Sequence, residues 1–176
     1  KYEAANEAAL KLFANPKANT HDKAESLFVQ KKVVSDKDNN NHKDSIPLLE
    51  QILELNALDN NLHYALMSEL AQRYLINLDY QDAFETSEKF LNETKIEKKE
   101  ILSVKANALY RLKRLPEAIA ALNKVHAMDP ENTAVTQMLI KAYSENKEPA
   151  KAAELAKTVV QTTGTDHVSR INLAIT

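Results

Sequence analysis

Small residues recur in this chain at a spacing of 34 or 35 residues, and this spacing constrains the fold more than any other feature. Two series of such positions are Ala71, Ala106, Ile140, Ala174 and Ala83, Ala118, Ala152. Two further series with the same spacing hold larger apolar side chains, namely Tyr74, Leu109, Tyr143 and Phe90, Val125, Val159. A unit of this size cannot bury its apolar face alone, so the spacing predicts a stack of similar units.

Each unit is expected to be a pair of helices. Apolar residues return every three or four positions, as in the stretch 66–75, and no stretch alternates with period two. Pro116 and Pro149 stand where the first turn of a helix tolerates proline. The pattern predicts helices over 2–14, 21–35, 44–56, 62–77, 80–93, 98–113, 116–127, 132–145, 149–162 and 166–176, with a solvated polar loop over 35–43.

Glycine is almost absent, with Gly164 the one example in 176 residues. Phosphate-binding loops, dinucleotide fingerprints and nucleophile elbows need glycine where the backbone takes positive φ or approaches a ligand closely. Those sites are therefore not expected. The turns should depend on asparagine, aspartate and proline, and Gly164 is expected to stop the helix before it.

Composition excludes further classes. The 23 basic and 25 acidic residues give a net charge of -2 without a basic stripe, which argues against nucleic-acid binding. No apolar run is long enough to span a membrane. The absence of cysteine excludes disulfides. The chain starts at Lys1 without a signal-peptide pattern, which suggests a trimmed or processed product, so cytoplasm and bacterial periplasm both remain open.

The segment 109–130, LYRLKRLPEAIAALNKVHAMDP, closely resembles the tetratricopeptide repeat. The resemblance implies an all-α fold, a right-handed α-solenoid of stacked antiparallel helix pairs. It places repeats over 61–95, 96–130 and 131–164 within a repeat region 44–176, and a partial fourth repeat or capping helix over 165–176. Residues 1–43 are expected to form degenerate N-terminal repeat helices ending in the polar loop.

In proteins that this chain resembles, the first helix of each pair lines a concave groove that binds a peptide or a partner helix. The matching positions here are Ser68, Gln72, Ser103, Asn107, Tyr110, Arg111, Gln137 and Lys141. Glu100 and Glu145 occupy further groove positions and offset the cations, so charge alone predicts no ligand sign. The cations that clamp acidic chaperone tails in some relatives are missing at their usual positions, and that clamp is not expected.

Catalytic and metal chemistry find little support in the sequence. The five histidines lack the spacing of a helical zinc pair, and no serine, histidine and acid grouping has a recognisable motif spacing. Asp36, Asp38 and Asn40 resemble the start of a calcium loop, but Pro47 stands where the closing glutamate should be. No catalytic residue, metal or cofactor is therefore expected.

Three hypotheses of function follow. The first is a protein-interaction scaffold that binds a peptide or helix in the groove. The second is a regulatory or accessory segment of a larger enzyme or envelope-assembly protein. The third is a homo-oligomer formed through apolar terminal surfaces, with Tyr2, Leu10 and Phe13 at one end and Val168, Ile171 and Ile175 at the other.

Overall fold

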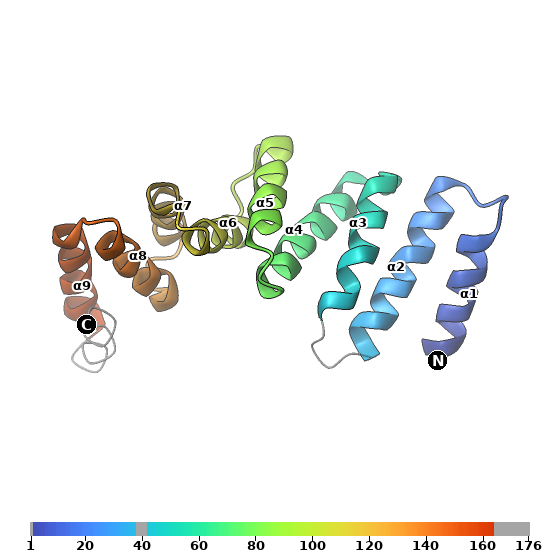
Figure 1. Ribbon diagram of the computed structural model, residues 1–176, viewed down its shortest axis with the longest axis horizontal. Coiled ribbons are helices and arrows are strands. Elements are labelled where there is room, and N and C mark those ends of the chain that lie inside the picture. The colour runs from blue at the N-terminus through green and yellow to red at the C-terminus, as the bar shows by residue number, and fades with distance from the viewer. Residues whose placement is uncertain (1, 38–41, 164–176) are drawn as a thin grey trace. The chain divides into compact units, whose positions relative to one another are not determined.

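The computed structural model describes residues 2–37 and 42–163, and the regular structure within these ranges is helical throughout (Figure 1). The chain divides into two units, unit 1 at Lys1–Lys95 and unit 2 at Ile96–Thr176. Successive helices within each unit pack against one another. The predicted all-α solenoid class is confirmed.

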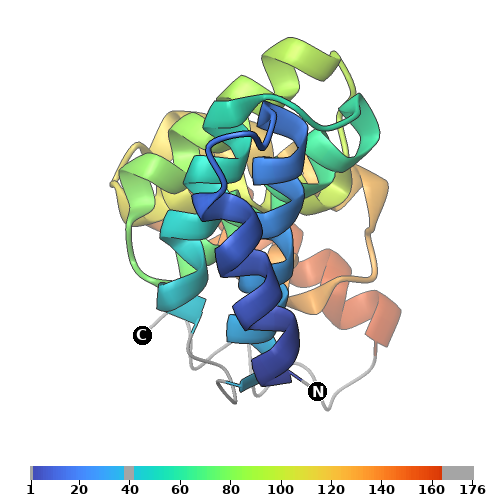
Figure 2. The same ribbon diagram turned by 90° about the vertical axis from the view of Figure 1, so that its right-hand side faces the viewer.

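Unit 1 contains five α-helices and a short 3₁₀ turn in its described residues. They are α1 (Tyr2–Ala14), α2 (Thr20–Lys37), η1 (His42–Ser45), α3 (Ile46–Leu55), α4 (Asn60–Ile76) and α5 (Tyr80–Thr94). Figure 2 views this unit from its α1 end, with α1 nearest the reader.

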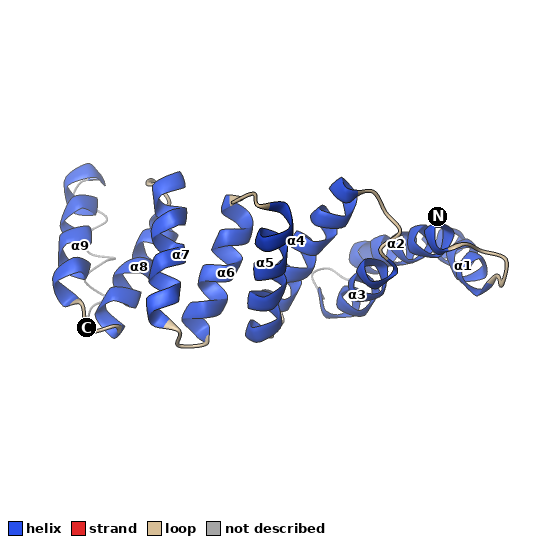
Figure 3. Cartoon of the chain, turned by 90° about the horizontal axis from the view of Figure 1, so that it is seen from above, coloured by secondary structure: helices blue, strands red, loops and turns tan. Residues whose placement is uncertain are grey.

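Unit 2 contains two helix pairs in its described residues. They are α6 (Lys99–Arg111) with α7 (Leu115–Met128), and α8 (Thr133–Glu145) with α9 (Pro149–Thr163). Figure 3 shows the four helices in a row, in chain order. The helix predicted over 166–176, together with Gly164, lies outside the described residues.

Helix ends follow the local chemistry of the sequence. The carboxylate of Asp59 accepts a hydrogen bond from the Leu62 amide, and the Asn132 side chain does the same for Val135. Proline stands in the first turn of α3, α7 and α9. As a result, every predicted helix within the described ranges begins and ends within two residues of its observed bounds.

The predicted loop 35–43 is the clearest error among these boundaries. Helix α2 continues through residues 35 and 36 to Lys37, and residues 42 and 43 already belong to η1. The polar composition of this stretch suggested a loop, but polar residues do not by themselves end a helix. Residues 38–41 lie outside the described residues.

The small positions form the centre of each helix pair. Ala71, Ala83, Ala106 and Ala118 have no exposed surface, and Ala152 is 3% exposed. Alanine at these positions lets the paired helices approach closely, while larger side chains such as Phe90, Leu109 and Val125 fill the surrounding space. The repeat read from the sequence is thus the repeat of the core.

The turns within the pairs contain the predicted residue types, with Asn77 and Asn146 at two of the helix ends, and they share one further feature. Each has a non-glycine residue at positive φ, namely Leu78 (69°), Lys113 (60°) and Lys147 (62°). The following amide donates to a carbonyl five residues back, at 2.9 Å in all three turns. This hydrogen bond holds the left-handed C-terminal stop that glycine usually supplies. Asparagine, aspartate and proline thus occur at these helix ends as predicted, and a left-handed residue other than glycine completes each turn.

Candidate functional site

Six of the predicted groove residues lie on α6 and α8, the first helices of the two pairs in unit 2. We call the surface that they form the first-helix face of unit 2: Ser103, Asn107, Tyr110, Arg111, Gln137 and Lys141. On each helix an amide side chain precedes a cation by one turn, Asn107 before Arg111 and Gln137 before Lys141. Arg111 and Lys141 are exposed, whereas the two amides are half-buried.

Hydrogen bonds through Glu145 join the ends of the two helices. The Tyr110 hydroxyl on α6 donates to Glu145 Oε1 on α8 at 2.5 Å, and Lys113 Nζ lies 2.8 Å from Glu145 Oε2. Lys113 also stands over the Tyr110 ring, 5.5 Å from its centroid. We call these three residues the Glu145 lock. They link the C-terminal end of α6 and its following turn to the C-terminal end of α8, at one end of the first-helix face.

The lock changes the protonation behaviour of its members. The hydrogen bond from Lys113, helped by that from Tyr110, lowers the pKa of Glu145. Burial and the Glu145 carboxylate together raise the pKa of Tyr110 to about 12. At neutral pH Glu145 is therefore an anion whose charge is already met by a cation of its own chain.

The side chains of Asn107, Arg111, Gln137 and Lys141, unlike those of the Glu145 lock, are not bound to other parts of the chain. Within residues 2–37 and 42–163, they make no hydrogen bond or ion pair to the chain. Ser103 is occupied, because its hydroxyl donates to the Lys99 carbonyl at 2.8 Å. The face thus offers two amides and two cations for an outside partner.

The two remaining predicted groove residues lie on α4 in unit 1. Ser68 is half-buried and Gln72 is exposed. Beside them, the Glu69 carboxylate binds Lys31 Nζ of α2 at 2.8 Å and Arg73 at 3.1 Å. We call Lys31, Glu69 and Arg73 the unit 1 ion cluster.

Sequence reasoning missed both charged groups. Lys113 and Glu145 are 32 residues apart, and Lys31 and Glu69 are 38 apart. A repeat alignment gives the register of helices but not the reach of long side chains from a neighbouring helix. A weak signal was present, since each group places opposite charges on neighbouring first helices or, for Lys113, in the turn that follows one.

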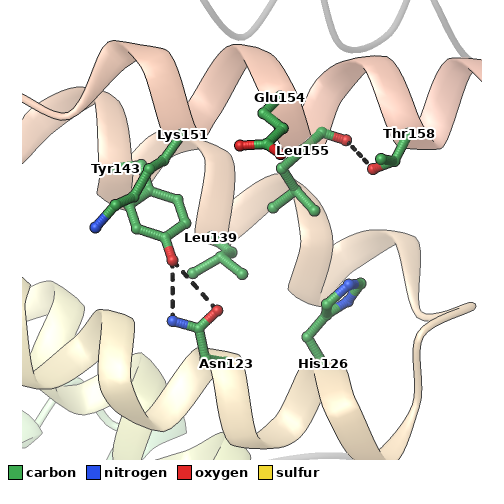
Figure 4. Close-up of a pocket in the computed structure, with 8 residues that line it drawn as sticks. All are labelled: Asn123, His126, Leu139, Tyr143, Lys151, Glu154, Leu155 and Thr158. Atoms are coloured by element: carbon green, nitrogen blue, oxygen red, sulfur yellow. Dashed lines mark hydrogen bonds between the residues drawn. The ribbon is translucent and has the colours of Figure 1, made fainter.

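A pocket of about 370 Å³ lies on the other side of α8, between α7 and α9 (Figure 4). Leu139 and Tyr143 of α8 line it, and each stands two residues beyond a residue of the first-helix face. Two residues correspond to about 200° around a helix, which places them on the opposite side from Gln137 and Lys141. The remaining lining residues are Asn123, His126, Lys151, Glu154, Leu155 and Thr158.

The polar groups of this pocket are mostly bound to one another. The Tyr143 hydroxyl and the Asn123 amide share hydrogen bonds of 3.0 and 3.3 Å, and Lys151 stands over the Tyr143 ring (Figure 4). Thr136 gives its one hydroxyl hydrogen to the Asn132 carbonyl, so His126 Nδ1, 3.2 Å from that hydroxyl, is the donor in their contact. Most polar groups of this pocket thus already have partners within the chain.

Metal and membrane chemistry gain no support from the described part of the chain. Across residues 2–37 and 42–163, histidine and acidic side chains form no cluster of three that could hold a metal ion. The calcium-loop stretch 36–40 falls on side chains outside the described ones. No helix among the described residues is long and apolar enough to cross a bilayer.

The alternating pairs and their alanine-filled centres define an α-solenoid, a class whose stacked helices generally present surfaces to other proteins. Residues 97–170 match the sequence model of the tetratricopeptide repeat. Residues 97–170 are thus a tetratricopeptide-repeat segment, as the segment 109–130 predicted, and solved structures of this class share the helical fold of both units.

Solved structures of this class are similar over most of their length. MamA of AMB-1 is 16% identical, with a TM-score of 0.70 over 96% of this chain and 87% of that one. MamA 41-end from Desulfovibrio magneticus RS-1 is 17% identical, with a TM-score of 0.66 over 95% and 86%. Nearly identical TPR-like repeats of a kinesin light chain candidate from Podosopora anserina are 21% identical, with a TM-score of 0.62 over 93% and 90%. These identities support the fold alone. A comparison with curated proteins gives no match.

Proposed function

We propose that this chain is a non-catalytic scaffold that binds an extended segment of another protein along the first-helix face of unit 2. The observation that supports the proposal most directly is the set of four polar ends, on Asn107, Arg111, Gln137 and Lys141, that are left without a partner in the described chain. The helices already order the backbone of these residues, so binding has to order only their side chains.

The spacing of these side chains suits an extended ligand. The amide and the cation on one helix are separated by about 6 Å along its axis, from the rise of 1.5 Å per residue. Alternate residues of an extended peptide lie about 6.6 Å apart. An amide can donate to and accept from a peptide backbone, and arginine is a common interface anchor. A protein ligand thus fits better than nucleic acid.

Photo-crosslinking tests the proposal. A photoreactive amino acid replacing Asn107 should capture a partner, and capture should fall when Arg111 and Lys141 are both changed to alanine in that background. The captured protein is then identified by mass spectrometry, and its crosslinked peptide shows which segment occupies the face.

Matched controls come from exposed positions elsewhere. The same photoreactive residue at Glu154, on the opposite side of α8, should not capture that partner, and Lys32→Ala with Lys157→Ala should leave capture at Asn107 unchanged. Equal capture from Asn107 and Glu154, or capture indifferent to Arg111 and Lys141, would contradict the proposal. A regulatory segment of a larger enzyme or envelope-assembly protein would use the same face.

A second candidate function is homo-oligomerisation through α1 and α2. A pocket of about 280 Å³ between them is lined by Ala5, Ala8, Ala9, Leu12, Glu25, Ser26 and Val29. Leu10 and Phe13 are 50% and 38% exposed on the same helix α1. The second terminal surface predicted from the sequence, at 168–175, lies outside the described residues. Light scattering across a concentration series checks this candidate: a constant monomer mass rejects it.

A further inference from the structure

The charge of the first-helix face differs from the balance that its sequence suggests. Four charged residues occupy groove positions on α6 and α8: Glu100, Arg111, Lys141 and Glu145. If each is counted as one full charge, the two negative and the two positive charges cancel. The structure gives the two acidic residues different surroundings from the two cations, so the equal count does not describe the field that a ligand meets.

Glu145 is neutralised within the chain. Its two carboxylate oxygens accept from Tyr110 and Lys113 at 2.5 and 2.8 Å, which leaves them poorly placed to bind Arg111 or Lys141. Lys141 acts on Glu145 only through space, without a hydrogen bond or ion pair. Glu145 and Lys113 together contribute no net charge to this end of the face.

Glu100 is too far from Arg111 to offset it. Eleven residues of α6 separate the two, which corresponds to about 16 Å along the helix axis. The Debye length at physiological ionic strength is about 8 Å, so an exposed charge at that distance is largely screened. Glu100 instead lies beside Lys99, whose ammonium binds Asp129 at 2.9 Å.

Arg111 and Lys141 therefore dominate the local field, each one turn beyond an amide that can bind a peptide backbone. We infer that the first-helix face of unit 2 selects an acidic, extended peptide segment, whose carboxylates meet Arg111 and Lys141 while Asn107 and Gln137 bind its backbone. The inference rests on the proposed function and adds to it the sign of the ligand's charge.

Synthetic peptides test the sign directly. The probe is a blocked peptide of alternating glutamate and alanine, compared with its glutamine and lysine counterparts by fluorescence anisotropy. The acidic probe should bind about tenfold more tightly than the glutamine probe, equivalent to two exposed charge contacts. Its affinity should fall as salt concentration rises, whereas that of the glutamine probe should not.

Two variants of the chain should shift that affinity in opposite directions. Arg111→Gln with Lys141→Gln should remove the preference for the acidic probe, while Glu145→Gln should strengthen binding several-fold, because it removes the local anion and frees Lys113. Lys32→Gln with Lys157→Gln has the same change in net charge as the first variant, and should keep the preference. Far-UV circular dichroism checks that each variant is folded.

The outcomes separate the two proposals. The charge inference is overturned if the glutamine or lysine probe binds as well as the acidic one, if the acidic probe does not bind, or if a duplex oligonucleotide competes it away. Binding that depends on Asn107 and Gln137 but is indifferent to probe charge would reject the inference alone. Binding of all probes that ignores all four side chains would also reject the proposed function.

Discussion

In unit 1, partly buried charges join the neighbouring first helices α2 and α4, whereas in unit 2 the equivalent positions on α6 hold buried apolar side chains and the charged contact to α8 is the exposed Glu145 lock. Between α2 and α4, Glu69 binds Lys31 and Arg73, whose side chains are 11% and 17% exposed. In the next repeat, 35 residues on, the positions of Glu69 and Arg73 hold Val104 and Ala108, which are 5% and 0% exposed. One helical framework thus accepts two chemistries at equivalent positions.

The difference shows which part of a repeat is fixed by the fold. The positions at the centre of the pairs are held by buried alanine, with the larger Ile140 as the exception in the α8–α9 pair, because the distance between paired helices depends on their volume. The positions between successive first helices need only be matched to one another. A half-buried carboxylate is tolerated in unit 1 because two cations meet it, whereas the equivalent position in unit 2 holds the buried aliphatic side chain of Val104.

The largest expected effect comes from moving the unit 1 residue into unit 2. Val104→Glu places a carboxylate at a site that is 5% exposed and that holds an aliphatic side chain in the native chain. The free energy of unfolding should fall by about 3–4 kcal/mol, the usual effect of an uncompensated buried charge. Urea denaturation followed by circular dichroism measures it.

The loss from Val104→Glu should shrink at acidic pH. Burial raises the pKa of a carboxyl, so the folded protein can hold the neutral acid there, whereas the unfolded chain ionises above its ordinary pKa. Ala120→Glu, on an exposed part of α7, is the control and should change stability by less than about 0.5 kcal/mol. If the Val104→Glu protein is as stable as the wild type, this site tolerates a charged side chain and the prediction is wrong.

The next effect tests the ion cluster itself. Glu69→Ala leaves Lys31 and Arg73 close together without their anion, and should cost about 2–3 kcal/mol of stability. Substituting all three residues, Lys31→Met, Glu69→Val and Arg73→Ala, copies the apolar chemistry of unit 2. That triple variant should recover most of the lost stability, because all three charges are removed and no unpaired charge remains buried.

Glu7→Ala is the matched control for the ion cluster. Its pair with Lys11 is also within one unit, at 2.7 Å, but both side chains are more than two-thirds exposed. The cost should stay below about 1 kcal/mol. If Glu69→Ala costs no more than Glu7→Ala, or if the triple variant is no more stable than Glu69→Ala, the account of this cluster is wrong.

A smaller effect tests what the two units share. Leu78 in unit 1 and Lys147 in unit 2 hold equivalent turns at positive φ, where a Cβ is unfavourable by about 1 kcal/mol. Leu78→Gly and Lys147→Gly should each raise the free energy of unfolding by about 0.5 kcal/mol, once the greater freedom of glycine in the unfolded chain is included.

Lys113→Gly should gain less than the other two turn variants, because it also removes the ion pair with Glu145. Ala120→Gly, in the middle of α7, should instead lose about 1 kcal/mol. The measurement is again urea denaturation, with the thermal midpoint as a second readout. A loss of stability in Leu78→Gly and Lys147→Gly would mean that the left-handed stop depends on these side chains.

The sequence predicted what is local and repeated. The helices, the alanine positions and the prolines at first turns all depend on neighbours within one or two turns, and those neighbours can be read directly. The resemblance to the tetratricopeptide repeat, and not the local pattern, placed Asn107, Arg111, Gln137 and Lys141 at groove positions. Their role in binding stays a prediction.

What the sequence could not predict depends on contacts between helices. The Glu145 lock depends on how far Lys113 and Tyr110 reach across to α8, and the ion cluster on where Lys31 of a degenerate repeat meets α4. The positive φ of Leu78 was also missed, since leucine disfavours that conformation. There the hydrogen bond from the Asp79 amide to the Tyr74 carbonyl, together with the packing of α4 against α5, outweighs the local preference.

The smallest expected effect separates the units by the direction of their pH dependence. In unit 1, His21 Nδ1 lies 2.9 Å from the Ala57 carbonyl and Nε2 lies 3.3 Å from Glu25, and these contacts raise the pKa of His21 above 6.5, with the carbonyl contact the larger cause. In unit 2, Lys113 holds the pKa of Glu145 below 4.5. The His21 contribution is therefore complete below pH 6.5 and is lost as pH rises through the folded pKa. The Glu145 contribution is present above pH 4.5 and is lost as pH falls through the folded pKa.

Two variants test whether His21 and Glu145 cause these opposite changes of stability with pH. His21→Gln should flatten the decline in stability above pH 6.5 without altering the acid side, and Glu145→Gln should reduce the acid loss without altering the neutral side. Two-dimensional NMR of the His21 ring and of the Glu145 carboxyl carbon gives the two pKa values directly. A His21 pKa at or below 6.5 would mean that His21 does not cause the loss of stability above pH 6.5. An unshifted pKa of Glu145 would mean that the hydrogen bonds of the Glu145 lock are not formed in solution. An open lock would return a free anion to the first-helix face, so this titration also tests the charge on which selection of an acidic ligand depends.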